Sequence, residues 1–209
     1  MAPWLTEGDE RRIAVIGNAG GGKSTLARRI AVSQGVPYVE VDRLLWRQNW
    51  KLADPACYAL AHDQAIDAPS WVIDGLGRKE SIPKRLARST DIILVDLPLW
   101  VHFWLAAERQ IAWSQGHIEH APAGAKTAPP TKALFRTIWE VDQTWMPDLR
   151  QQIAQVEAEA GKTVLRISTL DQLNALTNEF PLPNWMSRTQ ISFPKGSPAS
   201  SRHRASHPP

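Results

Sequence analysis

The eight residues from Gly17 to Ser24, GNAGGGKS, constrain this chain more than any others. They match the pattern G-x-x-x-x-G-K-[ST], in which backbone N–H groups surround a phosphate and the lysine reaches the outer phosphates. A run rich in β-branched residues, Arg12 to Gly17 (RIAVIG), precedes the pattern, and a segment with helical spacing follows it. Because consecutive glycines are conformationally costly without a use, the sequence predicts an anion-binding loop between a strand and a helix.

Four more short apolar runs follow the first, and segments with helical spacing separate them. Each run is apolar almost throughout, which is typical of parallel strands covered on both faces. The alternation of strand and helix predicts an α/β fold with a doubly wound, five-stranded parallel sheet in three layers. The further strands are expected at residues 38–42, 71–75, 91–96 and 163–168.

Several helices have recognisable starts. Asp54 followed by Pro55 predicts an N-cap with proline in the first turn. Ser168 with Asp171 predicts the start of another helix, over three regularly spaced leucines. A single long helix is expected over about residues 132–160.

The chain is expected to contain one folded domain with attachments, since 209 residues are too few for two comfortable cores. Residues 1–10 form an acidic N-terminal extension, and residues 11–180 form the domain. A polar segment at about 112–131 is interpreted as a short lid. Six of the sixteen prolines fall in residues 181–209, with four basic residues and no acidic one, so this tail is expected to be disordered.

Charge and composition limit the partners. The net charge of +3 comes from the tail, because residues 11–180 carry only +2, so direct binding of nucleic acid is not expected. No stretch approaches the 18 or so apolar residues that a membrane span needs, and no secretory signal is evident. With Cys57 as its single cysteine, the protein is expected in the cytoplasm. The sequence leaves the oligomeric state open.

The glycine-rich loop predicts a nucleotide site. Lys23 would contact the β and γ phosphates of ATP, and the Ser24 hydroxyl would bind Mg²⁺. Such a site also needs a carboxylate near the metal, and three predicted strands end in an aspartate: Asp42, Asp74 and Asp96. The expected nucleotide-binding residues are Gly17, Asn18, Ala19, Gly20, Gly21, Gly22, Lys23, Ser24 and Thr25.

The ten tryptophans divide into two groups. Those on the helices that flank the lid, including Trp100, Trp104 and Trp139, are interpreted as core residues. Trp46 and Trp50 follow Asp42 in an insertion, where each could belong either to the core or to a substrate site.

Four segments resemble the adenylate-kinase-like P-loop proteins often labelled DNA topology modulation proteins. They are Ile13–Arg28 (IAVIGNAGGGKSTLAR), Val41–Trp46 (VDRLLW), Trp71–Gly75 (WVIDG) and Asp96–Pro98 (DLP), and the resemblance covers about residues 11–180. It implies the P-loop nucleoside triphosphate hydrolase fold, with sheet order 2-3-1-4-5. The acceptor would bind between the segment after the second strand and a lid after the fourth.

The resemblance also implies roles for individual residues. Asp74 and Arg78 fall on the aspartate and arginine of the D-G-x-x-R segment of adenylate kinases. Asp74 would then hold the metal with Ser24, and Asp42 would lie beside the acceptor hydroxyl. Arg78 would stabilise phosphate charge. Apart from the resemblance, Arg109 on the helix that leads into the lid is a candidate for the same role, and Arg136 just after the lid is another.

One departure from the family keeps a second hypothesis open. Kinases of this class usually bring lid arginines onto the transferred group, whereas no arginine lies between Ile111 and Lys132. The leading hypothesis is a Mg²⁺- and ATP-dependent kinase of a nucleoside, nucleotide or other small metabolite. The alternative is a non-catalytic, nucleotide-dependent regulatory protein or switch with a link to DNA topology. A metal pair at His117 and His120 is the weaker interpretation of those loop histidines.

Overall fold

The fold is built on a five-stranded parallel sheet. The computed structural model describes residue 5 and residues 10–117, 128–158 and 162–182. Spatially the strands run β2-β5-β1-β6-β7, which is the expected order 2-3-1-4-5 for the five sheet strands in chain order. This confirms the predicted fold class. The strands are β1 (Arg12–Gly17), β2 (Tyr38–Glu40), β5 (Trp71–Asp74), β6 (Asp91–Val95) and β7 (Thr163–Ile167).

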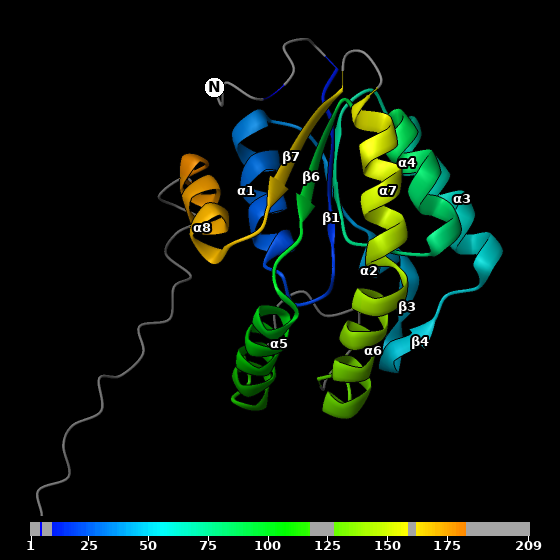
Figure 1. The fold of residues 1–209 in the computed structure, drawn as a ribbon. Helices are drawn as coiled ribbons and strands as arrows, with labels where there is room; N and C mark the ends of the chain where they lie inside the picture. The colour runs from blue at the N-terminus through cyan, green and yellow to red at the C-terminus, as the bar shows by residue number, and fades with distance from the viewer. Residues whose placement is uncertain (1–4, 6–9, 118–127, 159–161, 183–209) are drawn as a thin grey trace, which may run out of the picture.

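Helices cover both faces of the sheet. In Figure 1, α1 (Lys23–Gln34) and α8 (Leu170–Glu179) lie on one face, and α3 (Pro55–Asp67), α4 (Ile82–Arg88) and α7 (Met146–Glu157) lie on the other. Two further helices, α5 (Leu99–Ser114) and α6 (Thr131–Thr144), extend beyond the carboxyl ends of the strands. Ligands of open α/β sheets bind at this edge.

The connection from β2 to β5 carries an insertion on the same side. It contains α2 (Val41–Leu45) and the short antiparallel pair β3 (Trp46–Arg47) and β4 (Lys51–Leu52). A 3-10 turn, η1 (Gln48–Trp50), joins these two strands, and another, η2 (Lys79–Ser81), precedes α4.

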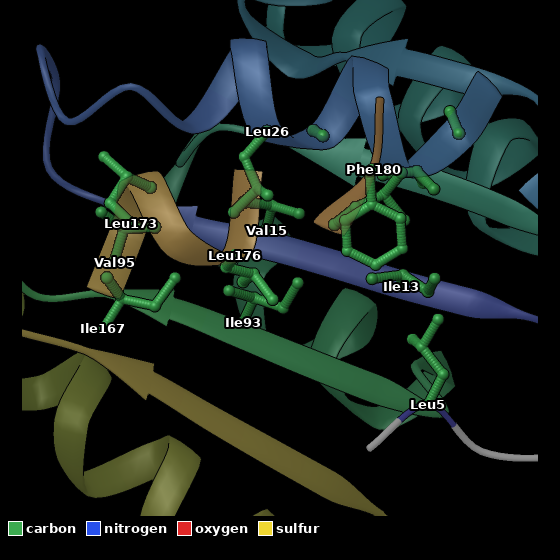
Figure 2. Packing of buried hydrophobic residues seen from close by; sticks show 14 of the residues in the cluster. Leu5, Ile13, Val15, Leu26, Ile93, Val95, Ile167, Leu173, Leu176 and Phe180 are labelled. Atoms are coloured by element: carbon green, nitrogen blue, oxygen red, sulfur yellow. The ribbon is translucent and has the colours of Figure 1, made fainter. Parts of the chain in front are cut away.

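The larger core lies between the sheet and the pair α1 and α8. Figure 2 shows Leu173, Leu176 and Phe180 packed over alternate residues of the strands, with Leu26 of α1 beside them. Leu5 reaches the same cluster and is only 5% exposed. On the opposite face, residues of α3, α4 and α7 cover the other set of alternate strand residues, including Ala14, Ile16 and Leu94. Burial on both faces explains why the strands are continuously apolar.

Three local expectations were wrong. The predicted helix at 132–160 is two helices, α6 and α7, because Pro147 in the first turn of α7 cannot continue a helix from α6. The cap of α8 is Thr169, which forms a capping box with Gln172, instead of Ser168. Asp42 lies in the first turn of α2, since the second strand already ends at Glu40.

The expected extension at 1–10 and the tail at 181–209 lie mostly outside the described residues. Half of the lid at about 112–131 lies outside them as well, namely residues 118–127 with His120. None of the helices in the described ranges is both long and apolar enough to cross a membrane.

Candidate functional site

The loop from β1 to α1 has a backbone that only glycine tolerates. Gly20 has φ +74°, and a Cβ at this position would lie 2.7 Å from the backbone oxygen of His102. Gly22 adopts a left-handed conformation as the N-cap of α1 and provides no side-chain hydrogen bond to the helix. The first N–H groups of α1 therefore have no capping side chain, which suits an anion at the helix N-terminus. Ser24 and Thr25 follow in that first turn.

Lys23 is held inside the loop. It is 8% exposed, and its Nζ donates to the backbone oxygen of Asn18 at 2.5 Å. The Asn18 side chain is fully buried: Nδ2 donates to the oxygen of Ile138 on α6 at 2.8 Å, and Oδ1 accepts from the N–H of Ala19. Asn18 thus connects the lysine, the loop and α6.

His102 of α5 contacts the backbone of the glycine-rich loop, and no pattern in the sequence indicated this role. The residue is 1% exposed, and its Nδ1 lies 2.9 Å from the backbone oxygen of Ala19. A carbonyl oxygen can only accept, so Nδ1 carries the proton. Burial, followed by the charge of Lys23, lowers the pKa of His102, which makes the neutral ring the form present at pH 7.

Asp74 lies at the end of β5, beside the start of α1. It is 3% exposed, and the Ser24 hydroxyl lies close enough to favour its ionised form. The Tyr38 hydroxyl is 3.3 Å from Asp74 Oδ1 and 3.0 Å from Glu40 Oε1, and Glu40 is the register partner of Asp74. Burial raises the pKa of Asp74 to about 6, while the Ser24 hydroxyl and Lys23 oppose the rise.

Asp42 extends from α2 toward the same place. A Cβ on Gly75, the residue after Asp74, would lie 3.5 Å from Asp42 Oδ1. Asp42 retains solvent access, yet the protein around it limits its hydration and raises its pKa. The charges of Lys23 and Arg109 oppose that rise. Burial lowers the pKa of Lys23, Asp74 and Asp42 oppose the fall, and Arg109 adds to it. Three predicted site residues, from α2, β5 and α5, therefore lie within electrostatic range of Lys23 on α1.

A row of three tryptophans begins beside Arg109. The Arg109 guanidinium lies 5.6 Å from the centre of the Trp113 ring. The Trp113 ring lies 5.8 Å from Trp50, which is 6.0 Å from Trp46. This row joins the insertion after β2 to the end of α5. Trp50 has φ +57°, a strained conformation for a large side chain. Trp46 and Trp50 are half-buried and lie outside the three core clusters.

Other predicted residues are directed elsewhere. The Arg78 guanidinium donates to the oxygen of Ala53 at 3.0 Å and lies 5.6 Å from the centre of the Tyr58 ring. Asp96 accepts two hydrogen bonds of 2.8 Å from Arg150 of α7.

Three tryptophans expected in the core are exposed. Trp100 and Trp104 on α5 are 63% and 60% exposed, and Trp139 on α6 is 53% exposed. These two helices extend past the edge of the sheet, so their outer faces have no layer to pack against within the described chain.

Arg85 of α4 is a further charged residue that sequence reasoning missed. Its side chain is fully buried, and Nη2 donates to the backbone oxygens of Gly75 at 2.8 Å and Leu76 at 3.1 Å. Burial lowers the pKa of Arg85 to about 10, against the attraction of Tyr58, Asp74 and Asp42. An arginine on a short helix is usually a surface residue, so no local pattern distinguishes it.

The donor set fits magnesium held together with a nucleotide. The described residues contain no cluster of three or more histidine, cysteine, aspartate or glutamate side chains that could hold a metal. Mg²⁺ in phosphate sites needs only one or two protein oxygens, since phosphates and water supply the others. The Ser24 hydroxyl and the Asp74 carboxylate, which lie beside each other, provide such a pair.

Comparisons with known proteins identify the fold. No protein-family model and no curated protein matches the chain. A shikimate kinase from Acinetobacter baumannii, solved with shikimate, superposes with a TM-score of 0.53 at 10% identity, over 88% of this chain and 97% of that one.

Two other solved structures match less closely. A gluconokinase from Sinorhizobium meliloti gives a TM-score of 0.46 at 16% identity, over 87% and 98% of the two chains. A sugar kinase from Janibacter gives 0.46 at 18% identity, over 81% and 91%. At 10% identity the likeness to the shikimate kinase concerns the fold alone, and the chain has the fold of the P-loop kinases.

Proposed function

We propose that this protein is a kinase that transfers the γ-phosphoryl group of ATP to a hydroxyl group of a small molecule. The observation that carries the proposal is that Asp42, Asp74 and Arg109 lie within electrostatic range of Lys23, which is buried in the glycine-rich loop that opens α1. A cation for phosphates, two carboxylates and an arginine within electrostatic reach are the groups that phosphoryl transfer needs.

The donor half consists of the loop and α1. Residues 17–25 would bind the phosphates through backbone N–H groups, and the Lys23 ammonium would exchange the oxygen of Asn18 for phosphate oxygens. Ser24 and Asp74 would hold Mg²⁺, which supplies neutralisation of phosphate charge when it is bound. His102 would keep the loop in place through the oxygen of Ala19.

Asp42 would act on the acceptor. Its carboxylate would accept the proton of the acceptor hydroxyl as the new oxygen–phosphorus bond forms and the bond from the γ-phosphorus to the bridging oxygen breaks, which releases ADP. Its pKa is raised because the surrounding protein limits its hydration, so it is a stronger base than an ordinary aspartate. Its location beside Gly75 and its attraction to Lys23 and Arg109 support this role.

Arg109 would supply the transition-state cation that an arginine-free lid lacks. It is half-buried and within electrostatic range of both Lys23 and Asp42. Partial burial strengthens its effect on developing negative charge. Arg78 would help only after exchanging its bond to the oxygen of Ala53 for one to phosphate.

The acceptor would lie near Asp42, Trp46 and Trp50, on the side of the insertion. The half-buried indole rings offer apolar surface for a planar or ring-shaped compound. We also propose, from the four sequence motifs, that the protein is related to those labelled DNA topology modulation proteins. We further propose a cytoplasmic location and a division into an extension (1–10), a domain (11–180) and a basic tail (181–209).

Direct binding and turnover test the proposal. ATP affinity would be measured by calorimetry with and without Mg²⁺, and ADP release would be followed against a panel of nucleosides, nucleotides and phosphorylatable metabolites. Lys23→Ala should abolish tight binding of ATP, whereas Lys132→Ala, which removes an exposed lysine of α6, should not. Asp42→Asn and Arg109→Ala should retain ATP binding and lose acceptor-dependent release of ADP by about 10²-fold or more. Arg136→Ala, at an exposed position of α6, is the matched control for Arg109.

The outcomes separate the two hypotheses. A wild type that binds no Mg-ATP would refute nucleotide binding and kinase activity together. Intact ATP binding with no turnover across the whole panel would favour the regulatory switch. Loss of ATP binding in Lys23→Ala together with turnover that depends on Asp42 would support the kinase.

A further inference from the structure

The segment that follows Asp74 is fastened on both sides by buried side chains. On one side, Tyr58 of α3 accepts the N–H of Arg78 at 3.1 Å, and its hydroxyl is 2.9 Å from Ser81 Oγ. Gly77 is required there, because a Cβ would lie 2.1 Å from the Tyr58 hydroxyl oxygen. On the other side, Arg85 Nη2 donates to the oxygens of Gly75 and Leu76. The segment that carries Asp74 toward Ser24 therefore has little freedom.

Burying Arg85 to hold this backbone costs free energy. Its side chain is fully buried, yet Nε and Nη1 have no hydrogen-bond partner among the described residues. A buried guanidinium with unfilled donors is destabilising unless nearby charges compensate for its lost hydration. No carboxylate within the described ranges forms an ion pair with it at contact distance. The groups that attract its charge are Tyr58, Asp74 and Asp42, and the last two are the carboxylates of the site.

We propose that Arg85 is a positioning residue that fixes the Gly75–Leu76 backbone and thereby holds Asp74 against Ser24, where the metal of Mg-ATP would bind. This inference rests on the proposed function, because it assigns to Arg85 a share of the Mg²⁺-dependent part of ATP binding. Arg85 itself is fully buried, so in this proposal it acts through the backbone of Gly75 and Leu76 and not on the nucleotide or the metal.

The proposal distinguishes Arg85 from a purely structural core residue. An apolar side chain of similar length would remove the unfilled donors, so Arg85→Met should unfold at the same temperature as the wild type or higher. The same variant should lose the restraint on Asp74. Residues that orient a metal ligand typically account for a 10- to 100-fold difference in metal affinity. Stability and Mg²⁺-dependent binding should therefore change in different directions.

The experiment compares ATP affinity in MgCl₂ with ATP affinity in EDTA, by calorimetry on the full-length protein. Arg85→Met should lower the affinity in MgCl₂ by about 10- to 100-fold and leave the affinity in EDTA unchanged. Arg85→Lys, which retains a charge and a donor for Gly75, should recover part of the loss. Arg85→Gln, which retains donors without the charge, shows how much of the effect comes from the charge and is a second variant should Arg85→Met not fold.

The matched control is Arg88→Met on the same helix. Arg88 is exposed, is paired with Asp67 at 3.1 Å and donates to the oxygen of Ile66. Its replacement should leave both ATP affinities at wild-type values.

Three results are decisive. An undiminished Mg²⁺ effect in Arg85→Met and Arg85→Gln would overturn this inference and leave the proposed function standing. Equal losses in MgCl₂ and EDTA, with a lower unfolding temperature and no recovery in Arg85→Lys, would make Arg85 a structural residue and overturn it as well. A wild type that binds no ATP would overturn the proposed function and this inference together.

Discussion

Replacing His62 with phenylalanine should remove a pH dependence of folding stability between pH 6.5 and pH 4. His62 lies in α3, is 1% exposed and stacks on Tyr58 with 5.8 Å between the ring centres. Its Nδ1 is 3.6 Å from Asp63 Oδ1, too far for a hydrogen bond, and neither ring nitrogen has another partner among the described residues. Burial, assisted by the nearby charge of Arg85, lowers the pKa of His62 from 6.5 to about 4.

The sign and the magnitude follow from proton linkage. The unfolded chain protonates this histidine near pH 6.5 and the folded chain only near pH 4, so the unfolded state binds more protons in between. Stability is therefore lost as the pH falls through this window. A decrease of the pKa from 6.5 to about 4 corresponds to about 3 kcal/mol.

The measurement is urea unfolding of wild type and His62→Phe at a series of pH values from 4 to 7.5. The difference between the two proteins is the informative quantity, because groups such as Asp74, with a raised pKa, act in the opposite direction in the same window. The variant should gain about 3 kcal/mol relative to wild type on going from pH 7 to pH 4. His62→Gln, which keeps a polar side chain that does not titrate, should show the same change relative to wild type as His62→Phe. A difference that stays constant with pH for both variants would refute the reasoning.

Three further outcomes are expected. Asp74→Asn should stabilise the ligand-free protein by up to about 3 kcal/mol at pH 7.5 in thermal unfolding, because a carboxylate with a raised pKa destabilises the fold above that pKa. The same variant should lose the Mg²⁺ dependence of ATP binding, and a lower stability would contradict this account. Asp96→Asn weakens a largely exposed ion pair with Arg150, so it should change the free energy of unfolding by less than about 1 kcal/mol and leave the ATP affinity unchanged. A large loss of ATP affinity would instead identify Asp96 as the carboxylate that binds the metal. Thr169→Ala should cost about 1 kcal/mol in urea unfolding through loss of the capping box with Gln172, and an unchanged stability would show that the cap is dispensable.

Local sequence patterns predict most of the sheet and the glycine-rich loop of the site. The strand cores were predictable because buried parallel strands are apolar on both faces, and the loop from Gly17 to Ser24 was predictable because its glycines serve one backbone geometry. The ends were less predictable. Asp42 was placed in a strand, but the chain turns into α2 after Glu40, and no residue pattern there signals the change.

The parts of the site that escaped prediction depend on contacts distant in sequence. Arg85 and His102 look like ordinary residues of α4 and α5, and only tertiary packing buries them beside the turn after β5 and beneath the glycine-rich loop. For Trp100 and Trp104 the error is the opposite one, because both were predicted to be buried and are exposed. Their spacing suggests a helix that faces a core, whereas α5 has left the sheet at that point and exposes both rings.

The bond from Asn18 to Ile138 has a consequence for the order in which the protein matures during synthesis. The two residues are 120 positions apart, so the glycine-rich loop leaves the ribosome long before α6 exists to receive the Asn18 side chain. Strand β1 must also await β6, its neighbour on one side, before the sheet around the loop is complete. A nascent chain that stops before α6 would therefore carry every residue of the phosphate motif without this anchor for it. The glycine-rich loop is therefore synthesised early, but its bond to α6 can form only after most of the domain has been synthesised.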